Sequence, residues 1–259
     1  MADGPSTKEI LLDAVVETLG KDALATVKPH EIDESAPKAA PAPEAAEPPM
    51  CITQQDVPVN LRNSPVDIVV GLNAECPRWV PGSVVKYAVW QNGFASPQDA
   101  DHAATHLALA AKTWNEAGVG VTFEWVALAK DATFVLCHGG AKGGVLASAF
   151  FPNSNDLDYL FVYSSAFRTS WKPHMWKVFL HELGHVLGLR HEFAIEREGM
   201  GATALGPPNE YSVMNYRPEP PELQQSDIDS TKLFYSLTED AQGNLPKVGL
   251  TEVVDYTPR

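Results

Sequence analysis

Short runs of alternating apolar and polar residues between positions 79 and 164 predict β-strands joined by turns. The clearest run is 82–90, and the Asn-Gly pair that follows it is typical of tight turns. Further strands are predicted at 121–126, 133–136, 144–152 and 157–164. Pro152 closes the run 144–152, and because proline lacks a backbone N–H donor, we expect this strand at the edge of a sheet.

Apolar residues three and four positions apart predict helices over residues 6–20, 96–116, 171–187 and 226–234. Ser6 and Glu9 have the spacing of a capping box at the start of the first helix, and Gly20 ends it. This helix is amphipathic and needs a surface to pack against. Ser226 is predicted to cap the last helix.

The Ala/Pro-rich stretch 36–49 cannot form a core and predicts an extended, semi-rigid linker. We therefore divide the chain into four parts. These are an acidic N-terminal segment at 1–50, a connecting segment at 51–76, a main domain at 77–236 and a C-terminal tail at 237–259. No pattern predicts an element in the tail.

Composition and charge limit the classes of partner. The chain has 259 residues and is 44% apolar, which is ample for one buried core plus a smaller appendage. Its formal charge of −14 argues against nucleic acid and anionic membranes as partners, because both would repel it. No apolar run is long enough to span a membrane, and residues 1–5 lack the features of a secretory signal. The sequence therefore predicts a soluble protein that is cytoplasmic or secreted by a non-classical route.

The strongest chemical signal is the segment HELGHVLGLRH, which starts at His181. Side chains four apart share one face of a helix, so His181 and His185 can bind one metal ion together. Glu182 lies one residue round the helix, where a general base can reach a metal-bound water. Gly188 can adopt the left-handed conformation that ends the helix, and the turn can deliver His191 as a third ligand. Three histidines leave one coordination position open, which is typical of catalytic zinc.

A second motif, Ser-Val-Met-Asn-Tyr at residues 212–216, follows the third histidine. The two motifs together resemble the metzincin zinc peptidases and their Met-turn. Within that clan the sequence is most similar to the astacin-like branch, because Glu192 directly follows His191 and Tyr216 stands two residues after Met214. Matrixin-like features are also present, although matrixins carry a different residue at the tyrosine position.

The resemblance implies an α+β fold for residues 77–236. It predicts a twisted, mostly parallel five-stranded sheet with an antiparallel edge strand, an active-site helix and a C-terminal subdomain with the Met-turn. Met214 is expected to pack beneath the histidines as an apolar floor and not to bind the metal. Gly188 and Glu192 are expected to have structural roles at the site.

The same resemblance implies a zinc metalloendopeptidase that acts on protein or peptide substrates. Glu182 would serve as general base on a zinc-activated water. Tyr216 would bind the zinc at rest or donate a hydrogen bond to the oxyanion, unless it is a packed tyrosine. The predicted edge strand would pair with an extended substrate, or it is an ordinary edge strand. Its central residues are Val145, Leu146, Ala147 and Ser148.

Two alternatives remain open. The first is a catalytically inactive metal-binding scaffold or interaction module of the same fold, against which the intact Glu182 argues. The second concerns His102 and His106, which are also four residues apart. No carboxylate stands in the base position beside His102 and no third histidine follows, so we expect a solvated or packed pair.

Cys51 follows the linker, and its thiolate could occupy the open zinc position and make the protein a zymogen. Asp56 is the alternative, because astacin-like prosegments usually employ an aspartate. Cys51 could instead form a disulfide with Cys76 or Cys137, or remain an unused thiol. Residues 1–50 are accordingly either part of a propeptide or a disordered tail.

Two further features have a functional and a simpler interpretation. Carboxyl and amide groups in the turn 153–158 could bind calcium, but a polar turn is the commoner explanation. The groups concerned belong to Asn153, Asn155, Asp156 and Asp158. Arg168, Lys172 and Lys177 lie near the active-site helix and could favour acidic substrate side chains, or they are solvated surface bases.

Overall fold

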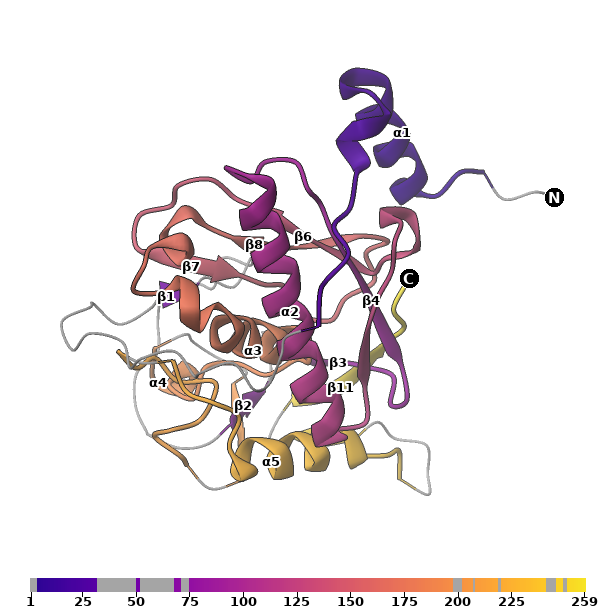
Figure 1. Cartoon of the computed structure of the whole chain (residues 1–259). Helices are drawn as coiled ribbons and strands as arrows, with labels where there is room; N and C mark the ends of the chain where they lie inside the picture. Colours follow the sequence, from indigo (N-terminus) through magenta and orange to yellow (C-terminus); the bar gives the residue numbers. More distant parts are fainter. Residues whose placement is uncertain are drawn as a thin grey trace.

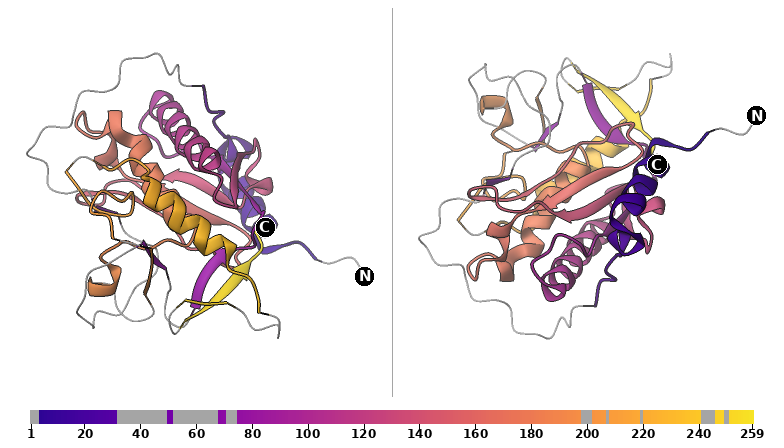
Figure 2. Two further views of the ribbon diagram at one scale, coloured as in Figure 1. Left: turned by 90° about the horizontal axis from the view of Figure 1, so that it is seen from below. Right: turned by 90° about the horizontal axis from the view of Figure 1, so that it is seen from above.

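The computed structural model describes residues 4–31, 50–51, 68–70, 75–197, 202–206, 208–218, 220–240, 246–248 and 251–259. The main sheet consists of β1 (Met50–Cys51), β4 (Val84–Val89), β5 (Thr122–Trp125), β6 (Phe134–His138), β7 (Val145–Ser148) and β8 (Asp158–Val162). Helices α2 (Pro97–Ala117) and α3 (Met175–Val186) lie against one face of this sheet (Figures 1 and 2).

The order of strands in the main sheet is β1-β7-β8-β6-β4-β5. Strands β5, β4, β6 and β8 are parallel, and β7 is antiparallel to β8. These five strands have the predicted arrangement, but the sheet has six strands because β1 adds to β7 in parallel. The expectation that β7 forms the edge is therefore wrong in this structure, because Met50 pairs with Val145 and Cys51 with Ala147.

Five helices, α1 (Thr7–Leu19), α2, α3, α4 (Ala194–Arg197) and α5 (Gln225–Ser236), occur among the described residues. The capping box of Ser6 and Glu9 is present, as predicted. Helix α3 begins later than predicted, because Lys172–His174 forms a 3-10 turn first. The prediction of Ser226 as cap is also wrong, since Gln224 caps α5 and Asp227 completes the capping box.

Helix α1 packs beside the sheet, on the surface formed by β4, β6 and the 3-10 turn Ala129–Asp131 (Figure 1). Leu12 is buried there in a small apolar cluster. The other buried members of the cluster are Ala88, Ala129, Ala132, Val135 and Cys137. The amphipathic pattern of α1 thus has a partner within the same chain.

The C-terminal residues form strands that the sequence pattern does not predict. β10 (Lys247–Val248) and β11 (Thr251–Tyr256) form a three-stranded sheet with β3 (Glu75–Trp79), and β11 is parallel to β3. Arg78 in β3 is buried and forms an ion pair of 2.6 Å with Asp255 in β11. Its guanidinium also donates to the carbonyl oxygen of Phe234, which connects this sheet to α5.

A third, two-stranded sheet pairs β2 (Ile68–Val70) with β9 (Thr203–Leu205) in antiparallel orientation. The sequence pattern predicts no strand at β9, which lies between the third histidine and the Ser-Val-Met-Asn-Tyr motif. The predicted linker 36–49 and Asp56 lie outside the described residues.

The large core between the sheet and the helices fixes α3 in place. Trp114 of α2 donates its indole N–H to the carbonyl oxygen of Leu180 at 3.0 Å. Trp79 of β3 donates to the carbonyl oxygen of Val186 at 2.7 Å. Both indoles are fully buried, so α3 is bound by two rigid side chains, one near its middle and one at its end.

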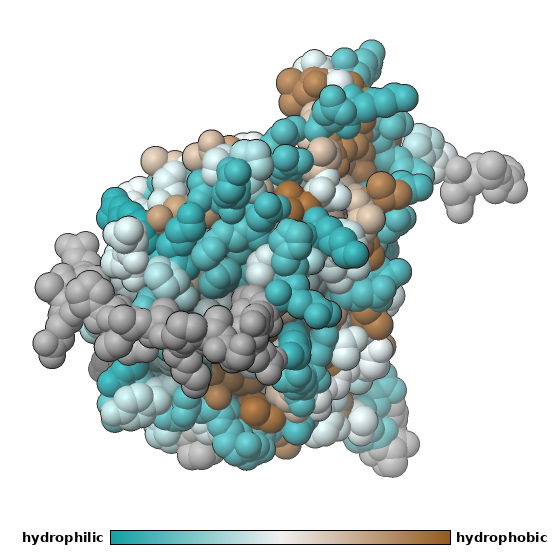
Figure 3. Space-filling view, viewed as in Figure 1, coloured by the Kyte–Doolittle hydropathy of each residue, from teal (hydrophilic) through white to brown (hydrophobic). Residues whose placement is uncertain are grey.

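The face of the molecule seen in Figure 3 is mostly hydrophilic, and apolar residues gather around α1. Three residues of α1 are exposed large hydrophobics, namely Ile10, Leu11 and Leu19. No helix in the described part of the chain is both long and apolar enough to cross a bilayer.

Candidate metal centre

Three histidine rings meet at the C-terminal end of α3. His181 and His185 lie one turn apart on this helix, and their ring centroids are 4.8 Å apart. Gly188 follows the helix with φ of +92°, and a Cβ at this position would overlap the carbonyl oxygen of Pro77. Glycine is therefore required for both its backbone conformation and its size. The turn places the ring of His191 within 5.1 Å of His181 and 4.7 Å of His185.

Backbone carbonyls orient two of these rings. Nδ1 of His181 donates to the carbonyl oxygen of Val213, and Nδ1 of His185 donates to that of Leu189, both at 2.7 Å. These bonds place the ring protons on Nδ1 and leave the Nε2 lone pairs for a metal. Burial lowers the pKa of His185 well below its usual value, and the neighbouring histidines lower it further. His185 is thus held in the neutral form that binds metal.

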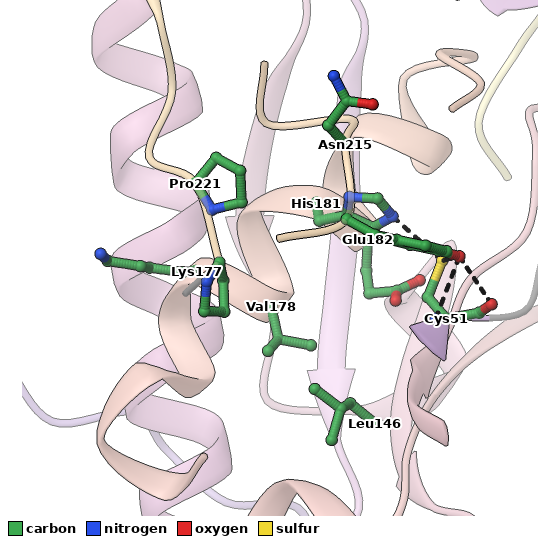
Figure 4. Close-up of a pocket in the computed structure, with 10 residues that line it drawn as sticks. Cys51, Leu146, Lys177, Val178, His181, Glu182, Asn215 and Pro221 are labelled. Carbon is green, nitrogen blue, oxygen red and sulfur yellow. Dashed lines mark hydrogen bonds between the residues drawn. The ribbon is translucent and has the colours of Figure 1, made fainter. Parts of the chain in front are cut away.

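The fourth member of the group is Cys51 from β1. Its Sγ lies 3.1 Å from Nε2 of His181, 3.4 Å from Nε2 of His185 and 3.1 Å from Nε2 of His191. In Figure 4 the sulfur of Cys51 faces His181 and Glu182. None of the three cysteines forms a disulfide, and Cys76 and Cys137 are buried elsewhere. The disulfide alternative for Cys51 is therefore wrong in this structure.

The four donor atoms lie close enough together to hold one metal ion. They lie within 4.8 Å of one another, and the three histidines are buried. Zinc bonds of about 2.0 Å to nitrogen and 2.3 Å to sulfur imply donor separations of roughly 3.4–3.6 Å in a tetrahedron. The observed separations between sulfur and nitrogen are only slightly shorter. Three imidazoles and one thiolate are also donors that zinc prefers.

Glu182 lies beside this group with no exposed surface. Neither carboxylate oxygen has a hydrogen-bond partner among the described residues. Burial raises the pKa of Glu182 well above its usual value, and the nearby Cys51 thiol opposes the shift. A buried carboxyl group with no partner other than the nearby thiol is a candidate functional group, because its burial costs several kcal/mol.

Tyr216 also contacts Cys51. Its hydroxyl donates to the carbonyl oxygen of Cys51 at 2.9 Å and accepts from the Cys51 backbone N–H at 3.2 Å. The hydroxyl lies 3.2 Å from the sulfur. Burial raises the pKa of Tyr216, and the thiol of Cys51 raises it further, so the phenol stays protonated. Tyr216 is thus a hydrogen-bond donor at the metal centre.

The segment that carries Tyr216 packs directly beneath α3. A Cβ on Gly184 would overlap the sulfur of Met214, which is fully buried. Asp227 accepts the backbone N–H of Val213 at 2.9 Å and so positions the carbonyl that orients His181. Glu192 accepts the side-chain amide of Asn215 at 2.6 Å and also the backbone N–H of Asn209 at 3.3 Å. These contacts give Glu192 and Met214 structural positions next to the site.

A small pocket opens beside Cys51, His181 and Glu182. Its apolar walls are Leu146, Val178, Pro220 and Pro221 (Figure 4). Lys177 also lines the pocket and forms an ion pair of 3.3 Å with Glu222. Lys177 is buried, and Lys172 forms an ion pair of 2.6 Å with Asp99. Neither lysine is therefore the solvated surface base that the sequence favours. Arg168 is exposed.

Several functional groups have no signal in the sequence. The carbonyls of Val213 and Leu189 belong to backbone, which the sequence pattern does not reveal. The adjacent prolines 220 and 221 could have been noticed as a rigid segment after the second motif, but nothing local places them in one pocket with Val178.

The second histidine pair is packed between helices and is not part of the metal group. The rings of His102 and His106 are 4.0 Å apart. His102 donates Nε2–H to the carbonyl oxygen of Lys172 at 2.9 Å, and Nδ1 of His106 accepts the backbone N–H of Trp176 at 3.1 Å. The pair therefore connects α2 to the start of α3, and the packed alternative describes it.

The polar side chains of the turn 153–158 bind protein groups. Asn155 donates to Asp158 at 3.1 Å, while Asp156 accepts the backbone N–H of Thr7 at 3.1 Å and contacts Arg259 at 3.3 Å. In the described part of the chain, only Cys51 and the three histidines 181, 185 and 191 form a group of three or more potential ligands close enough to bind one ion. Calcium binding at the turn stays a prediction.

A comparison of the sequence with protein-family models gives a match. A family model described as metallo-peptidase family M12 matches residues 82–226, which is more than half of the chain. The chain belongs to metallopeptidase family M12. Membership in family M12 implies a zinc peptidase, and peptidases of this kind act on proteins or peptides. The match covers the three histidines, Glu182 and Tyr216.

No curated protein matches the chain in sequence. Among solved structures, 27 chains match. One of them is described as the structure of myroilysin, with a TM-score of 0.45 and 13% sequence identity. That match covers 61% of this chain and 82% of the myroilysin chain.

Proposed function

We propose that this member of family M12 is a zinc endopeptidase that Cys51 holds in a latent form. The observation that carries the proposal is the convergence of three histidine Nε2 atoms and the Cys51 sulfur beside the buried carboxylate of Glu182. A catalytic zinc site uses three protein ligands and one open position. Here the thiol takes the position that water would occupy.

His181, His185 and His191 would hold the zinc ion. When bound, zinc supplies a Lewis acid that brings the pKa of a bound water down to about 7. Glu182 accepts the proton of the attacking water at its carboxylate and transfers it to the leaving amine. The burial that raises the pKa of Glu182 suits both steps, because the group must accept a proton and then release it near neutral pH.

Tyr216 is the proposed donor to the oxyanion. Its hydroxyl hydrogen-bonds to Cys51 now, and removal of Cys51 would leave it for a substrate carbonyl or for the zinc. This role, with Glu192 after His191 and Met214 in a Met-turn, supports the astacin-like branch of the family. When Tyr216→Phe is added to the active Cys51→Ala chain, we expect kcat to fall about tenfold or more, because an oxyanion donor is lost, with KM little changed. An unchanged kcat would leave Tyr216 a packing residue.

The substrate strand would lie against β7, at Val145–Ser148. In the latent form β1 pairs with β7 in the main sheet. β-strand addition is a common mode of peptide binding, and the backbone groups of β7 that β1 now bonds are suited to it. Met50 and Cys51 therefore block both the metal position and the edge where a substrate would pair.

The test uses zinc analysis and hydrolysis of an unspecific substrate such as casein. The wild-type chain should contain one zinc ion and show little activity, whereas full-length Cys51→Ala should be several-fold more active. The double variant Cys51→Ala with Glu182→Gln should keep its zinc and lose turnover, because the amide cannot accept the proton.

Each alternative has its own outcome in this test. Zinc in all variants without hydrolysis in any of them would favour the inactive scaffold. Equal activity of the wild type and Cys51→Ala would contradict latency through Cys51 but would leave the proposed peptidase activity intact. Asp56→Ala would then be measured.

A further inference from the structure

Residues 4–31 pack as part of the folded peptidase and do more than precede Cys51, the residue proposed to block the zinc position. We refer to Cys51 in this role as the lock. We call residues 4–31 the anchor. The backbone N–H of Val27 donates to the carbonyl oxygen of Val89 at 2.8 Å, and that of Gln91 donates to the carbonyl oxygen of Ala25 at 2.9 Å. Thr26 forms an antiparallel bridge with Trp90. The anchor thus extends the backbone hydrogen bonding of β4.

Side chains strengthen this attachment at two further places. Val27 is buried in the main core, and its carbonyl oxygen accepts the indole N–H of Trp125 at 3.2 Å. Lys8 in α1 is buried, and its ammonium donates to the carbonyl oxygen of Ala132 at 2.6 Å and to that of Arg259 at 3.1 Å. The anchor is therefore held by core packing, by β4 and by the C-terminal end of the chain.

On the C-terminal side of Cys51, the chain is attached to the catalytic domain a second time. β2, at Ile68–Val70, pairs with β9 through three residue pairs, and Val70 is fully buried in the main core. Cys51 lies between these points, since 18 residues at 32–49 separate Met50 from the anchor and 16 residues at 52–67 separate Cys51 from β2. The chain is thus attached to the catalytic domain on both sides of Cys51, through the anchor and through β2.

We propose that the anchor stays bound after the chain is cut, so that activation needs a cut on each side of Cys51. This inference rests on the proposed latency. After a cut within 32–49, Cys51 remains covalently joined to β2. After a cut within 52–67, Cys51 remains joined to the anchor.

The physical reason is effective concentration. A ligand joined to its site by a short chain rebinds as if it were present on the order of millimolar. A single cut leaves such a tether on one side or the other, so the thiol returns to the zinc position after each dissociation. Two cuts release a short peptide that contains Cys51, and the peptide is lost by dilution.

The experiment places the recognition sequence of a site-specific protease in the full chain, within residues 36–49, within residues 58–66, or in both. Size-exclusion chromatography with mass spectrometry follows the fragments, and casein hydrolysis follows activity. After the first cut, we expect the N-terminal fragment to elute with the catalytic domain and activity to stay at the level of the uncut chain.

The second cut alone should leave activity at least about tenfold below that of the doubly cut protein. This low activity should persist on dilution for as long as the anchor stays bound, because the thiol then rebinds within the same non-covalent complex. The doubly cut protein should match full-length Cys51→Ala in activity while the anchor still elutes with it. Separate elution of the anchor after the first cut, or full activity after either single cut, would overturn the proposal.

A matched pair of lysine variants tests the contacts. Lys8→Ala removes the two hydrogen bonds of a buried ammonium, whereas Lys21→Ala removes an exposed lysine of the same segment. In the protein cut within 36–49, Lys8→Ala should release several-fold more anchor than Lys21→Ala, and equal release would contradict the assigned contacts. If Cys51→Ala shows neither zinc nor hydrolysis, the proposed function fails, but elution of the anchor still reports whether it remains bound.

Discussion

Helices α2 and α3 each carry two histidines four residues apart, but only the pair on α3 belongs to the metal group. On α3, Nδ1 of each ring donates to a carbonyl and Nε2 faces the common centre. On α2, the nitrogen atoms of His102 and His106 bond to the backbone at residues 172 and 176. The spacing is the same, and the partners of the ring nitrogens differ.

This difference shows that helical spacing alone does not make a metal site. A site also needs groups that hold the second ring nitrogen and a turn that supplies further ligands. On α3 these requirements are met by the carbonyls of Val213 and Leu189 and by the turn at Gly188. On α2 the ring nitrogens serve instead to join the two helices.

The largest expected effect separates the two pairs directly. His185→Ala should lose zinc binding, and in the active Cys51→Ala chain also hydrolysis, because removal of one ligand costs more than the roughly 10–100-fold loss of affinity seen for outer-shell partners. His102→Ala should keep one zinc ion per chain. Zinc content after dialysis, measured on the folded fraction of both variants, checks this. Loss of zinc in His102→Ala would mean that the two pairs are not separate.

The second comparison uses the glycines after the two helices. Gly118 ends α2 with φ of +63° and has open space where a Cβ would lie. Gly188 follows α3 with φ of +92°, and a Cβ there would meet the backbone oxygen of Pro77.

Gly118→Ala should therefore lower the free energy of unfolding by only about 1–2 kcal/mol, from backbone strain. Gly188→Ala should cost more, by roughly 1–3 kcal/mol of steric overlap, and should weaken zinc binding as His191 is displaced. Urea denaturation and zinc titration of both variants test this. Equal losses of stability would show that the approach of Pro77 does not matter.

The third prediction concerns pH. Burial, together with the smaller effect of the charges of His102 and Lys172, lowers the pKa of His106 to about 3. An unfolded histidine has a pKa of about 6.5, so between these values the unfolded chain binds a proton that the folded chain does not. Stability should therefore decrease as the pH falls from about 6.5 towards 3.

His106→Gln keeps an acceptor for the backbone N–H of Trp176 but cannot become charged. We expect this variant to lose less stability than the wild type between pH 7 and pH 4, by about 1 kcal/mol or more. Thermal melting over this range, with the exposed His30→Gln as control, measures the difference. Parallel curves for the wild type and His106→Gln would contradict a buried, neutral His106.

The smallest expected effect concerns the ion pair that joins α2 to the segment before α3. Asp99 and Lys172 are 2.6 Å apart, and the hydrogen bond from Lys172 lowers the pKa of Asp99. A carboxylate with a lowered pKa stabilises the fold above its unfolded pKa of about 4, and this is lost as the pH falls through its lower folded pKa.

Asp99→Asn should therefore cost no more than about 1 kcal/mol at pH 7, since the pair is partly exposed. The difference from the wild type should disappear at about pH 2. Urea midpoints of the wild type and Asp99→Asn at both pH values measure this difference in stability. The same difference at both pH values would exclude the ion pair as its cause.

Local signals in the sequence predicted much of the fold and the site. The strands between residues 82 and 164, the start of α1 and the histidine motif each depend on residues that are close in sequence. Two helix starts were misplaced for local reasons, since Lys172–His174 forms a tight turn and Gln224 caps α5 in place of Ser226. The linker and Asp56 remain predictions.

By itself, the sequence determined which side chains can serve the chemistry. The roles of His181, Glu182, His185, Gly188 and His191 follow from their spacing, because all five lie on one helix and the turn after it. Tertiary structure alone decided that Cys51 reaches the three histidines, that β11 pairs with β3 and that the anchor extends β4. Each of these contacts joins residues far apart in the chain, and such pairings depend on how the folded core fits together, which periodicity and capping do not encode.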